Sequence, residues 1–248
     1  MESERYSQAM AKDGGPDTGL YEIGSNLNLA NFQRGLVGYW KFDEGSGTAA
    51  ADSSGRNNNG SVVGAIIWRS GSECANQNCV ETASGGSINV PYNSSLNLTT
   101  NVTYAHWIKI KTAIPASTWP YSLGNDSHKY IAWRSSSNGT NWMFEYGRNN
   151  PICDGLSGSY TSTGGINIGT NTWHHLVMTY DGSVIKTYVD GAQRHNVAFS
   201  LGFCSNSSSP YYIAYGSASP GVYLVDEARI YSRALSAAEI VAIYNATK

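Results

Sequence analysis

Two groups of oxygen-rich side chains, far apart in the sequence, could bind a metal ion. Asp43 and Glu44 follow an apolar run, and Asp52 opens an Asp-Ser-Ser-Gly turn that leads to Asn57–Asn59. Asp226 lies near the other end, in an alternating apolar stretch. Carboxylates and carbonyls are the hard oxygen ligands that calcium takes, so together these residues could supply the ligands of such an ion. The alternative is structural: Asp52 makes an Asx-turn and Asp226 accepts hydrogen bonds from backbone N–H groups.

The middle of the chain combines aromatic, amide, carboxylate and arginine side chains, which is the composition of a sugar-binding surface. The ligand-binding residues that we predict are Trp119, Tyr121, Trp133, Arg134, Trp142, Glu145, Tyr146, Arg148 and Tyr211. Further candidates are Asn125, Asp126, Asn149, Asp154, Tyr160 and Tyr212. About half of these aromatic residues are expected instead to be ordinary core or sheet-face residues of a β-rich domain. Five other aromatic residues are assigned to the core, namely Trp40, Trp107, Trp173, Tyr39 and Tyr180.

The C-terminal stretch changes from a strand pattern to a helix pattern. Residues 221–231 alternate, with Val222, Leu224, Ala228 and Ile230 on one face and Tyr223, Glu227, Arg229 and Tyr231 on the other. Asp226 falls on the apolar face, where an unpaired carboxylate is costly. Ser236 and Glu239 then form a capping box, flanked by Leu235 and Ile240 as a hydrophobic staple. The pattern therefore predicts a long strand followed by one short amphipathic helix.

The rest of the chain predicts short strands separated by turns rich in Gly, Asn and Ser. Asp181-Gly182 is a strong hairpin signal between two of them. The predicted strands cover residues 36–43, 60–66, 87–90, 102–111, 121–124, 130–135, 142–147, 172–180, 184–189 and 211–216. This spacing is typical of an all-β antiparallel sandwich.

Several motifs, in a fixed order, resemble laminin-G-like (concanavalin A-like) jelly-roll domains. The opening motif is Gly35-Leu-Val-Gly-Tyr-Trp-Lys-Phe-Asp-Glu-Gly-Ser-Gly47, and the closing motif is Val225-Asp-Glu-Ala-Arg-Ile-Tyr-Ser-Arg-Ala-Leu-Ser236. Between them come Ile88-Asn-Val-Pro91, Tyr104-Ala-His-Trp-Ile-Lys109, Trp173-His-His-Leu-Val-Met-Thr-Tyr-Asp-Gly182 and Tyr188-Val-Asp-Gly191. The resemblance extends from Leu36 to Asn245.

The resemblance implies a two-sheet antiparallel jelly-roll sandwich with a short C-terminal helix, over residues 35–248, preceded by an extension or strap over residues 1–34. It also implies a structural calcium between the opening loop and the closing strand. The predicted metal ligands are therefore Glu44, Asp52, Asn57 and Asp226. Because this fold carries lectins, adhesins, enzymes and structural modules, the resemblance does not by itself give the function.

An enzyme is the less favoured alternative, and no catalytic residue is assigned. Glycosidases of this fold carry a Glu-x-Asp-x-x-Glu pattern on one strand, because two carboxylates must flank one glycosidic bond. This pattern is missing from the sequence, and the adjacent pairs Asp43-Glu44 and Asp226-Glu227 point to opposite faces of a strand. His174 and His175 lack an accompanying nucleophile motif, so a structural role is expected for both.

The bulk properties favour an extracellular module. Charged residues make up 14% of the sequence and the net charge is -2, which provides no electrostatic case for nucleic acid or an anionic membrane. The four cysteines allow three disulfide connectivities, of which we favour Cys74–Cys79 with Cys153–Cys204; four unpaired thiols are the alternative. Disulfides would place the protein in an oxidising compartment.

The sequence contains no run of apolar residues long enough to cross a membrane. The first residues loosely resemble the segment after the membrane helix of bacterial pilin-like surface proteins. Together these features predict a non-catalytic module, secreted or at the cell surface, that binds a glycan or an extracellular protein. The alternatives are a glycoside hydrolase or lyase on the same fold, and a purely structural module of a pilus-like assembly.

Overall fold

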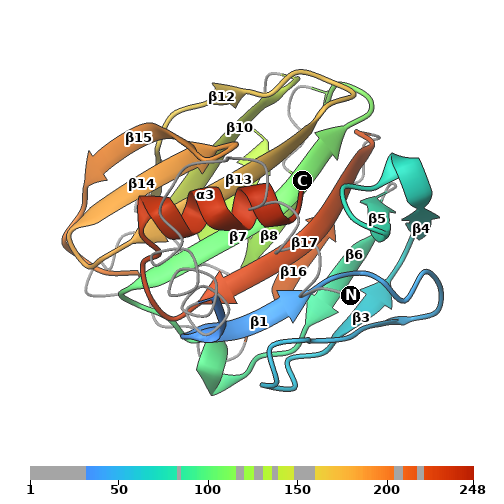
Figure 1. The fold of residues 1–248 in the computed structure, drawn as a ribbon, viewed down its shortest axis with the longest axis horizontal. Coiled ribbons are helices and arrows are strands. Elements are labelled where there is room, and N and C mark those ends of the chain that lie inside the picture. Colours follow the sequence, from blue (N-terminus) through green and yellow to red (C-terminus); the bar gives the residue numbers. More distant parts are fainter. Residues whose placement is uncertain are drawn as a thin grey trace, which may run out of the picture.

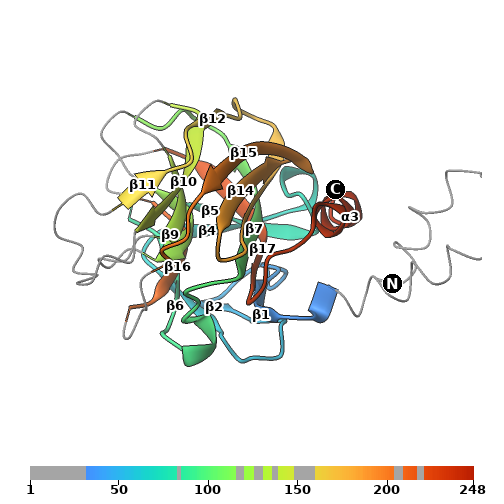
Figure 2. The ribbon, with the colours of Figure 1, turned by 90° about the vertical axis from the view of Figure 1, so that its left-hand side faces the viewer.

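The computed structural model describes residues 32–82, 85–115, 120–125, 131–135, 139–147, 160–203, 209–216 and 221–248. The described strands form two antiparallel sheets packed face to face, and one C-terminal helix lies on the outside (Figures 1 and 2). The predicted jelly-roll sandwich with a C-terminal helix is therefore confirmed. No described helix is long and apolar enough to span a membrane.

The first sheet, called sheet A, has the order β15-β14-β13-β7-β17-β5-β4, and β1 also pairs with β17. Its strands are β1 (Leu36–Trp40), β4 (Ile66–Ser70), β5 (Asn78–Thr82), β7 (Val102–Ile110), β13 (Trp173–Tyr180), β14 (Val184–Val189), β15 (Ala192–Ala198) and β17 (Tyr223–Tyr231). The long strands β7 and β17 pair along most of their length and lie at the centre of the sheet.

The second sheet, called sheet B, has the order β11-β10-β9-β8-β16-β6-β3-β2, with β12 also paired to β10. Its strands are β2 (Ala49–Ala50), β3 (Gly60–Val63), β6 (Ser87–Val90), β8 (Tyr121–Asn125), β9 (Ile131–Ser135), β10 (Asn141–Gly147), β11 (Tyr160–Ser162), β12 (Ile166–Asn167) and β16 (Tyr211–Tyr215). Two short 3-10 helices, Gly71–Glu73 and Ser94–Leu96, lie in the connections.

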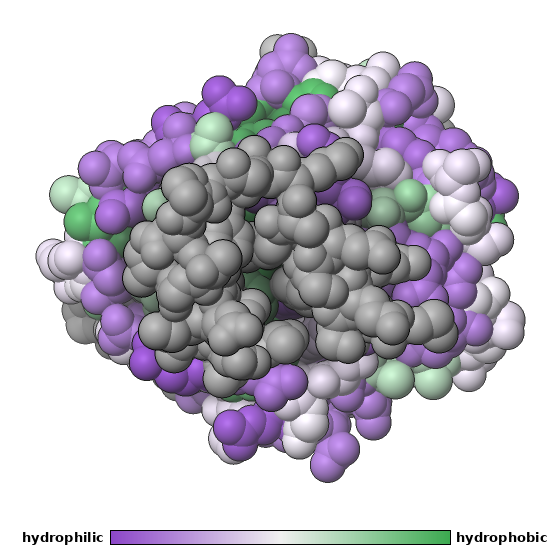
Figure 3. All heavy atoms as spheres, viewed as in Figure 1, coloured by the Kyte–Doolittle hydropathy of each residue, from purple (hydrophilic) through white to green (hydrophobic). Residues whose placement is uncertain are grey.

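The main core fills the space between the sheets and is rich in aromatic side chains. Its largest members with no exposed surface include Trp40, Trp133, Trp142, Phe144 and Tyr223. A second, smaller cluster lies on the outer face of sheet A, beneath the helix. The surface seen in Figure 3 is mostly hydrophilic, with hydrophobic side chains in small separate patches.

A β-bulge in β17 corrects the predicted alternation of this strand. The register against β7 shifts between Asp226 and Arg229, and Glu227 has a φ of 52°. Before the bulge it is Tyr223 and Val225 that point into the main core, whereas after it the core residues are Ala228 and Ile230. The prediction placed Tyr223 on the polar face, which is wrong because one extra residue reverses which side chains face inward.

The helix α3 (Ala237–Ala246) begins as the sequence predicts. The Ser236 side chain accepts a hydrogen bond from the Glu239 backbone N–H, and the Glu239 carboxylate accepts one from the Ser236 N–H at 2.9 Å. Leu235 and Ile240 belong to the outer cluster together, as a staple requires. The capping box and the staple therefore fix the residue at which the helix begins, and the helix packs on the outer face of sheet A.

We expect Ser236→Ala to lower the free energy of unfolding by about 1 kcal/mol, because the first turn of α3 loses its side-chain acceptor. Chemical denaturation followed by fluorescence measures this change. Ser53→Ala, in an exposed turn, is the matched control and should leave stability within about 0.5 kcal/mol of the parent. Equal stability of both variants would show that the capping box contributes nothing to the folded domain.

Candidate functional site

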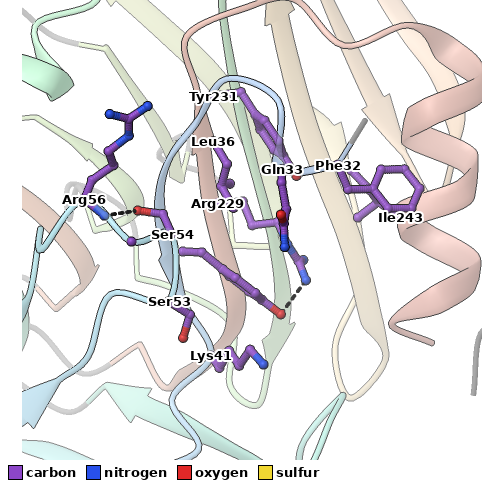
Figure 4. Close-up of a pocket in the computed structure, with 12 residues that line it drawn as sticks. Phe32, Gln33, Leu36, Lys41, Ser53, Ser54, Arg56, Arg229, Tyr231 and Ile243 are labelled. Atoms are coloured by element: carbon purple, nitrogen blue, oxygen red, sulfur yellow. Dashed lines mark hydrogen bonds between the residues drawn. The ribbon is translucent and has the colours of Figure 1, made fainter. Parts of the chain in front are cut away.

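A groove lies on the outer side of sheet A, between β1, β17 and the helix α3. Its volume is about 540 Å³, which lies within the range of about 300–1,000 Å³ that is usual for ligand sites. Residues of β1, β17, α3 and the turn after β2 line it: Phe32, Gln33, Leu36, Tyr39, Lys41, Ser53, Ser54, Gly55, Arg56, Arg229, Tyr231 and Ile243. Figure 4 shows Phe32 beside Ile243 at the helix end of the groove, with Ser53 and Lys41 at the opposite end.

The pairing of β1 with β17 brings an aromatic ring and two cations together in this groove. Tyr39 and Arg229 are directly opposite each other in the register. The Arg229 guanidinium carbon lies 4.0 Å from the centroid of the Tyr39 ring, and Lys41 Nζ lies 5.4 Å from the same centroid. Arg229 Nη2 donates to the Tyr39 hydroxyl at 2.6 Å and to the buried Glu227 carboxylate. The groove is thus organised by a hydrogen-bonded network in which Arg229 and Glu227 are buried and Tyr39 is half-buried.

Asp52 shapes the turn that forms the other wall of the groove. Its carboxylate accepts hydrogen bonds from the N–H groups of Tyr39, Ser54 and Asn58 at 2.8–2.9 Å, and from the Ser54 hydroxyl at 2.8 Å. The structure therefore shows the structural alternative predicted for Asp52, which is an Asx-turn. Because these four donors surround its carboxylate, Asp52 fixes the position of Ser53, Ser54 and the residues after them.

A second polar cluster lies where the Cys74–Cys79 loop meets the bulge of β17. The Asn76 N–H donates to Asp226 Oδ2 at 2.8 Å, and the Asn76 side-chain amide donates to Glu227 Oε1 at 3.1 Å. Asp226 is completely buried, and its Oδ1 atom has no hydrogen-bond partner. Burial, with the nearby Glu227 and Asp43 carboxylates, raises the pKa of Asp226 well above its usual range. Asp43 Oδ1 is likewise buried and unpartnered, and burial raises the pKa of Asp43 too.

The structure places the predicted metal ligands in different hydrogen-bonded surroundings. Glu44, Asp52 and Asp226 are all described, but no cluster of three or more His, Cys, Asp or Glu side chains in the described ranges is arranged to hold a metal. Asp52 is used by the turn, Glu44 accepts a hydrogen bond from the Ala51 N–H, and Asn57 is exposed with a φ of 58°. Asp226 instead has Asp43 and Glu227 as its electrostatic neighbours. Any ion beside Asp226 would therefore need backbone or amide carbonyls as further ligands.

Five of the predicted ligand-binding aromatic residues are in the core, so their prediction as stacking surfaces is wrong. Their exposed fractions are 6% or less: Tyr121, Trp133, Trp142, Tyr146 and Tyr211. Trp133, Trp142, Tyr146 and Tyr211 belong to the main core between the sheets, as in the edge-to-face pair of Trp142 with Tyr223 of sheet A. The Tyr121 ring is buried against Tyr215 of the same sheet. Burying a large ring is favourable at any inward position, and sequence composition does not distinguish the two faces of a strand.

Two polar residues of the predicted ligand-binding set contact each other. Arg134 of β9 and Glu145 of β10 form an ion pair at 2.7 Å, with exposed side-chain fractions of 11% and 7%. Burial raises the pKa of Glu145, although the Arg134 charge opposes the shift. Of the further candidates, Asn125 is buried and donates to Ser209 O at 3.2 Å, while Tyr212 is half-buried against Tyr215.

Other predicted residues lie outside the described ranges: Trp119, Arg148, Asp126, Asn149, Asp154, Cys153 and Cys204, and the extension over residues 1–31. Tyr160 is in β11, where only the backbone is described. The Cys74–Cys79 disulfide is formed, as predicted.

Among the aromatic residues assigned to the core, Trp40, Trp107 and Tyr180 are buried there. Tyr39 and Trp173 are not, because both are half-buried on the outer side of sheet A. Trp173 Nε1 donates to Glu73 O at 3.0 Å, and Lys109 Nζ lies 5.1 Å from its ring centroid.

The sequence did not predict the groove residues as a site, although the strand faces that carry them could be identified. Tyr39 and Lys41 share one face of the first predicted strand, and Arg229 and Tyr231 share one face of the last. Each pair alone is an ordinary polar strand face. Only the pairing of the first strand with the last, about 190 residues apart, makes them one surface.

Comparison with known families assigns the sequence to one of them. The family model described as "Concanavalin A-like lectin/glucanases superfamily" (Laminin_G_3) matches residues 82–241. No curated protein matches the sequence.

Among solved structures, the binding domain of Paraclostridial Mosquitocidal Protein 1 is similar with a TM-score of 0.69 and 17% identity. The alignment covers 85% of this chain and 52% of that one. The binding domain of Botulinum Neurotoxin DC in complex with SialylT is similar with a TM-score of 0.69 and 13% identity. That alignment covers 87% of this chain and 52% of the toxin domain. The chain thus spans about half the length of these toxin domains.

Domain 4 of AbnA, an extracellular GH43 arabinanase of Geobacillus stearothermophilus, in complex with arabinotriose, gives a TM-score of 0.64 and 19% identity. Here the alignment covers 83% of this chain and 96% of that one. At these identities the structural likeness shows the shared fold, and the family model carries the assignment. The chain belongs to the laminin-G-like family of the concanavalin A-like lectin/glucanases superfamily.

Proposed function

We propose that this protein is an extracellular, non-catalytic recognition module that binds carbohydrate in the groove between β1, β17 and the turn at residues 53–56. The observation that carries this proposal is the groove itself: a hollow of about 540 Å³ whose walls combine aromatic rings, serine hydroxyls and cationic side chains. Rings with hydrogen-bond donors around them are the groups that bind the apolar faces and the hydroxyls of a sugar.

Two further observations support the proposal. The described domain has nearly the full extent of a single carbohydrate-complexed domain, domain 4 of AbnA. The Cys74–Cys79 disulfide fits an oxidising compartment outside the cytoplasm. An extracellular protein as the ligand, a polysaccharide-active enzyme and a structural pilus-like module stay as the alternatives predicted from the sequence.

The proposal includes a structural calcium beside Asp43 and Asp226. Both residues have a buried carboxylate oxygen without a hydrogen-bond partner, and such an orphaned oxygen is costly unless a cation or donor satisfies it. Glu227 is already bonded to Tyr39, Arg229 and Asn76, so it is not the expected ligand. A calcium here would supply the missing positive charge and join the end of β1 to β17 and the disulfide loop.

The test is a glycan array with the purified protein, in calcium and again in chelator. We expect binding to a defined class of glycan, and we expect Ser53→Trp to abolish it because the new ring fills the exposed wall of the groove. Ser61→Trp, an equally exposed serine on β3 in sheet B, is the matched control and should bind as the parent does. Absence of binding to every glycan, or equal binding by the Ser53→Trp variant, would refute the groove as a carbohydrate site.

A further inference from the structure

A titratable side chain that the proposed function does not use lies beneath α3. His175 of β13 is completely buried, and neither of its ring nitrogens has a hydrogen-bond partner among the described residues. We infer that α3 is an acid-released cover: protonation of His175 frees the helix from sheet A and opens the groove where Ile243 lines it. The release of the helix does not depend on the proposed function, whereas its consequence for a ligand rests on it.

The last turn of α3 closes the space around the imidazole. The ring centroid of Tyr244 lies 6.2 Å from that of His175, and the centroid of Trp107 lies 5.3 Å from it. Tyr244 also stacks on Trp107 at 5.5 Å, and Trp107 Nε1 donates to Thr247 Oγ1 at 2.8 Å. The contacts that hold the end of the helix on the sheet therefore also keep water from His175.

The charged groups nearest to His175 do not compensate an imidazolium. Arg229 of β17, which is paired with Glu227, is a buried cation that disfavours a second positive charge. Asp190, in the turn after β14, favours the charged form, but its oxygens already bond the His175 backbone N–H at 2.8 Å and His174 Nδ1 at 2.7 Å. A protonated ring would therefore be buried without a hydrogen-bonded counter-ion in the described part of the chain, which is costly.

Other ionisable groups that the structure describes on the elements around His175 are basic or uncharged. His106 of β7 points into the main core, on the opposite face of sheet A. Tyr188 of β14 and Tyr244 of α3 contribute phenols, which are uncharged in weak acid. Lys248 follows α3 and adds another cation, with its Nζ 5.4 Å from the Tyr244 ring centroid. Protonation therefore favours a state in which His175 reaches water.

Detachment of α3 is the smallest change that exposes His175. The helix has ten residues, and isolated helices shorter than about 12–15 residues are marginal in water. Its buried side chains, Ile240 and Ile243, belong to the outer cluster, which is separate from the main core between the sheets. The helix can therefore open as a local unit while the sandwich stays folded. Ile243 would then leave its place beside Phe32 at the helix end of the groove (Figure 4).

The range between pH 7 and pH 5 isolates the effect of His175 from that of the nearby carboxylates. Burial lowers the pKa of His175 from 6.5 to about 3, so docking of the helix weakens as the pH falls below 6.5 and continues to weaken until about pH 3. Although burial opposes the shifts, hydrogen bonds lower the pKa of Glu239 to about 2 and that of Asp190 below its usual value. The stability that these two carboxylates contribute is lost mainly below pH 5.

Hydrogen–deuterium exchange of the intact protein at pH 7 and pH 5, read by mass spectrometry, tests the inference without a ligand. After correction for the intrinsic exchange rate, we expect the opening constant of α3 to rise about 25-fold, because pKa values of about 3 when docked and 6.5 when released give about tenfold per pH unit below 6.5. β7 should open less than α3 at both pH values. Equal opening of α3 and β7 at pH 5, or an α3 opening constant that does not change with pH, would overturn the inference.

Two variants identify the histidine responsible. In His175→Leu the opening constant of α3 should change by less than about twofold between pH 7 and pH 5, because the titrating group is removed. His106→Leu is the matched control: it replaces an equally buried histidine on the opposite face of sheet A and should keep the rise of about 25-fold. Loss of the rise in His106→Leu, with its persistence in His175→Leu, would assign it to the wrong face of the sheet for this inference.

The inference and the proposed function fail in different ways, because exchange is measured in the absence of any glycan. A pH-independent α3 would remove the acid release and leave the groove as a carbohydrate site. Absence of binding on the glycan array would remove the carbohydrate site and leave the release of the helix in acid as a property of the fold.

Discussion

Acidification from pH 7 to pH 5 is expected to lower the free energy of unfolding by about 4 kcal/mol through His106 and His175, about 2 kcal/mol for each. Burial lowers the pKa of each histidine from 6.5 to about 3. Both side chains are completely buried, and none of their ring nitrogens has a hydrogen-bond partner. Protonation below pH 6.5 therefore favours the unfolded chain, and this loss of stability continues until the pH approaches 3.

The two histidines lie on opposite faces of sheet A. His106 of β7 points into the main core, with its ring centroid 6.3 Å from that of Trp133. His175 of β13 lies under α3, against Trp107 and Tyr244. The Arg229 charge lowers the pKa of His175 further, while Asp190 opposes the shift. Neither site can accommodate an imidazolium without losing packing or admitting water.

The measurement is a series of denaturant titrations between pH 7 and pH 4, for the parent and for His106→Leu. Asp226, Asp43 and Glu145 have raised pKa values and contribute the opposite dependence, so the informative quantity is the difference between the two curves. We expect this difference to grow in favour of the variant by about 1.4 kcal/mol per pH unit below 6.5.

Ile108→Val, on the same strand and equally buried, is the control. It should lower stability by about 1 kcal/mol at every pH, because it removes one methyl group and no titrating group. If the His106→Leu curve ran parallel to that of the parent, His106 would not be a neutral buried histidine in the native state.

Calcium at a hundredfold excess over its dissociation constant is expected to raise the free energy of unfolding by about 2.7 kcal/mol. The reason is the pair of buried, unpartnered oxygens of Asp43 and Asp226. Burial, together with the Glu227 and Asp43 charges, raises the pKa of Asp226, and a cation would oppose these effects by stabilising both ionised carboxylates. Thermal or chemical unfolding with calcium and with chelator measures this increment.

Variants distinguish a calcium site at Asp43 and Asp226 from the set of metal ligands predicted from the sequence. Asp43→Asn and Asp226→Asn should lose most of the calcium increment. In chelator Asp226→Asn should be at least as stable as the parent, because it removes a buried charge. Asp52→Asn should be less stable in both conditions, since it weakens the turn after β2, but it should keep the full increment.

Either of two results would contradict this account. A calcium increment that disappears in Asp52→Asn and persists in Asp226→Asn would restore the ligand set predicted from the sequence. An identical unfolding curve in calcium and in chelator would remove calcium from the proposed function and leave the groove unaffected.

The sequence alone determined the features that depend on local pattern. Alternation, hairpin residues and the opening and closing motifs gave the two-sheet sandwich, and the capping box at Ser236 located α3 to the residue. Strands were missed where the pattern is weak. β15 is an edge strand with mostly exposed polar residues, and β5 follows directly on the disulfide loop. An edge strand is held by one neighbour, so its residues do not need to alternate.

Only the tertiary structure decided which faces and which distant residues form a site. The β17 bulge reverses which side chains face inward on the two sides of Asp226. Local propensity does not predict where one extra residue is inserted into a strand. The aromatic residues of sheet B look alike in sequence whether they face a ligand or sheet A. The groove joins Tyr39 to Arg229 because β1 pairs with β17, and this contact closes the chain across nearly its whole length. Pairing at such a distance is set by the packing of both sheets together.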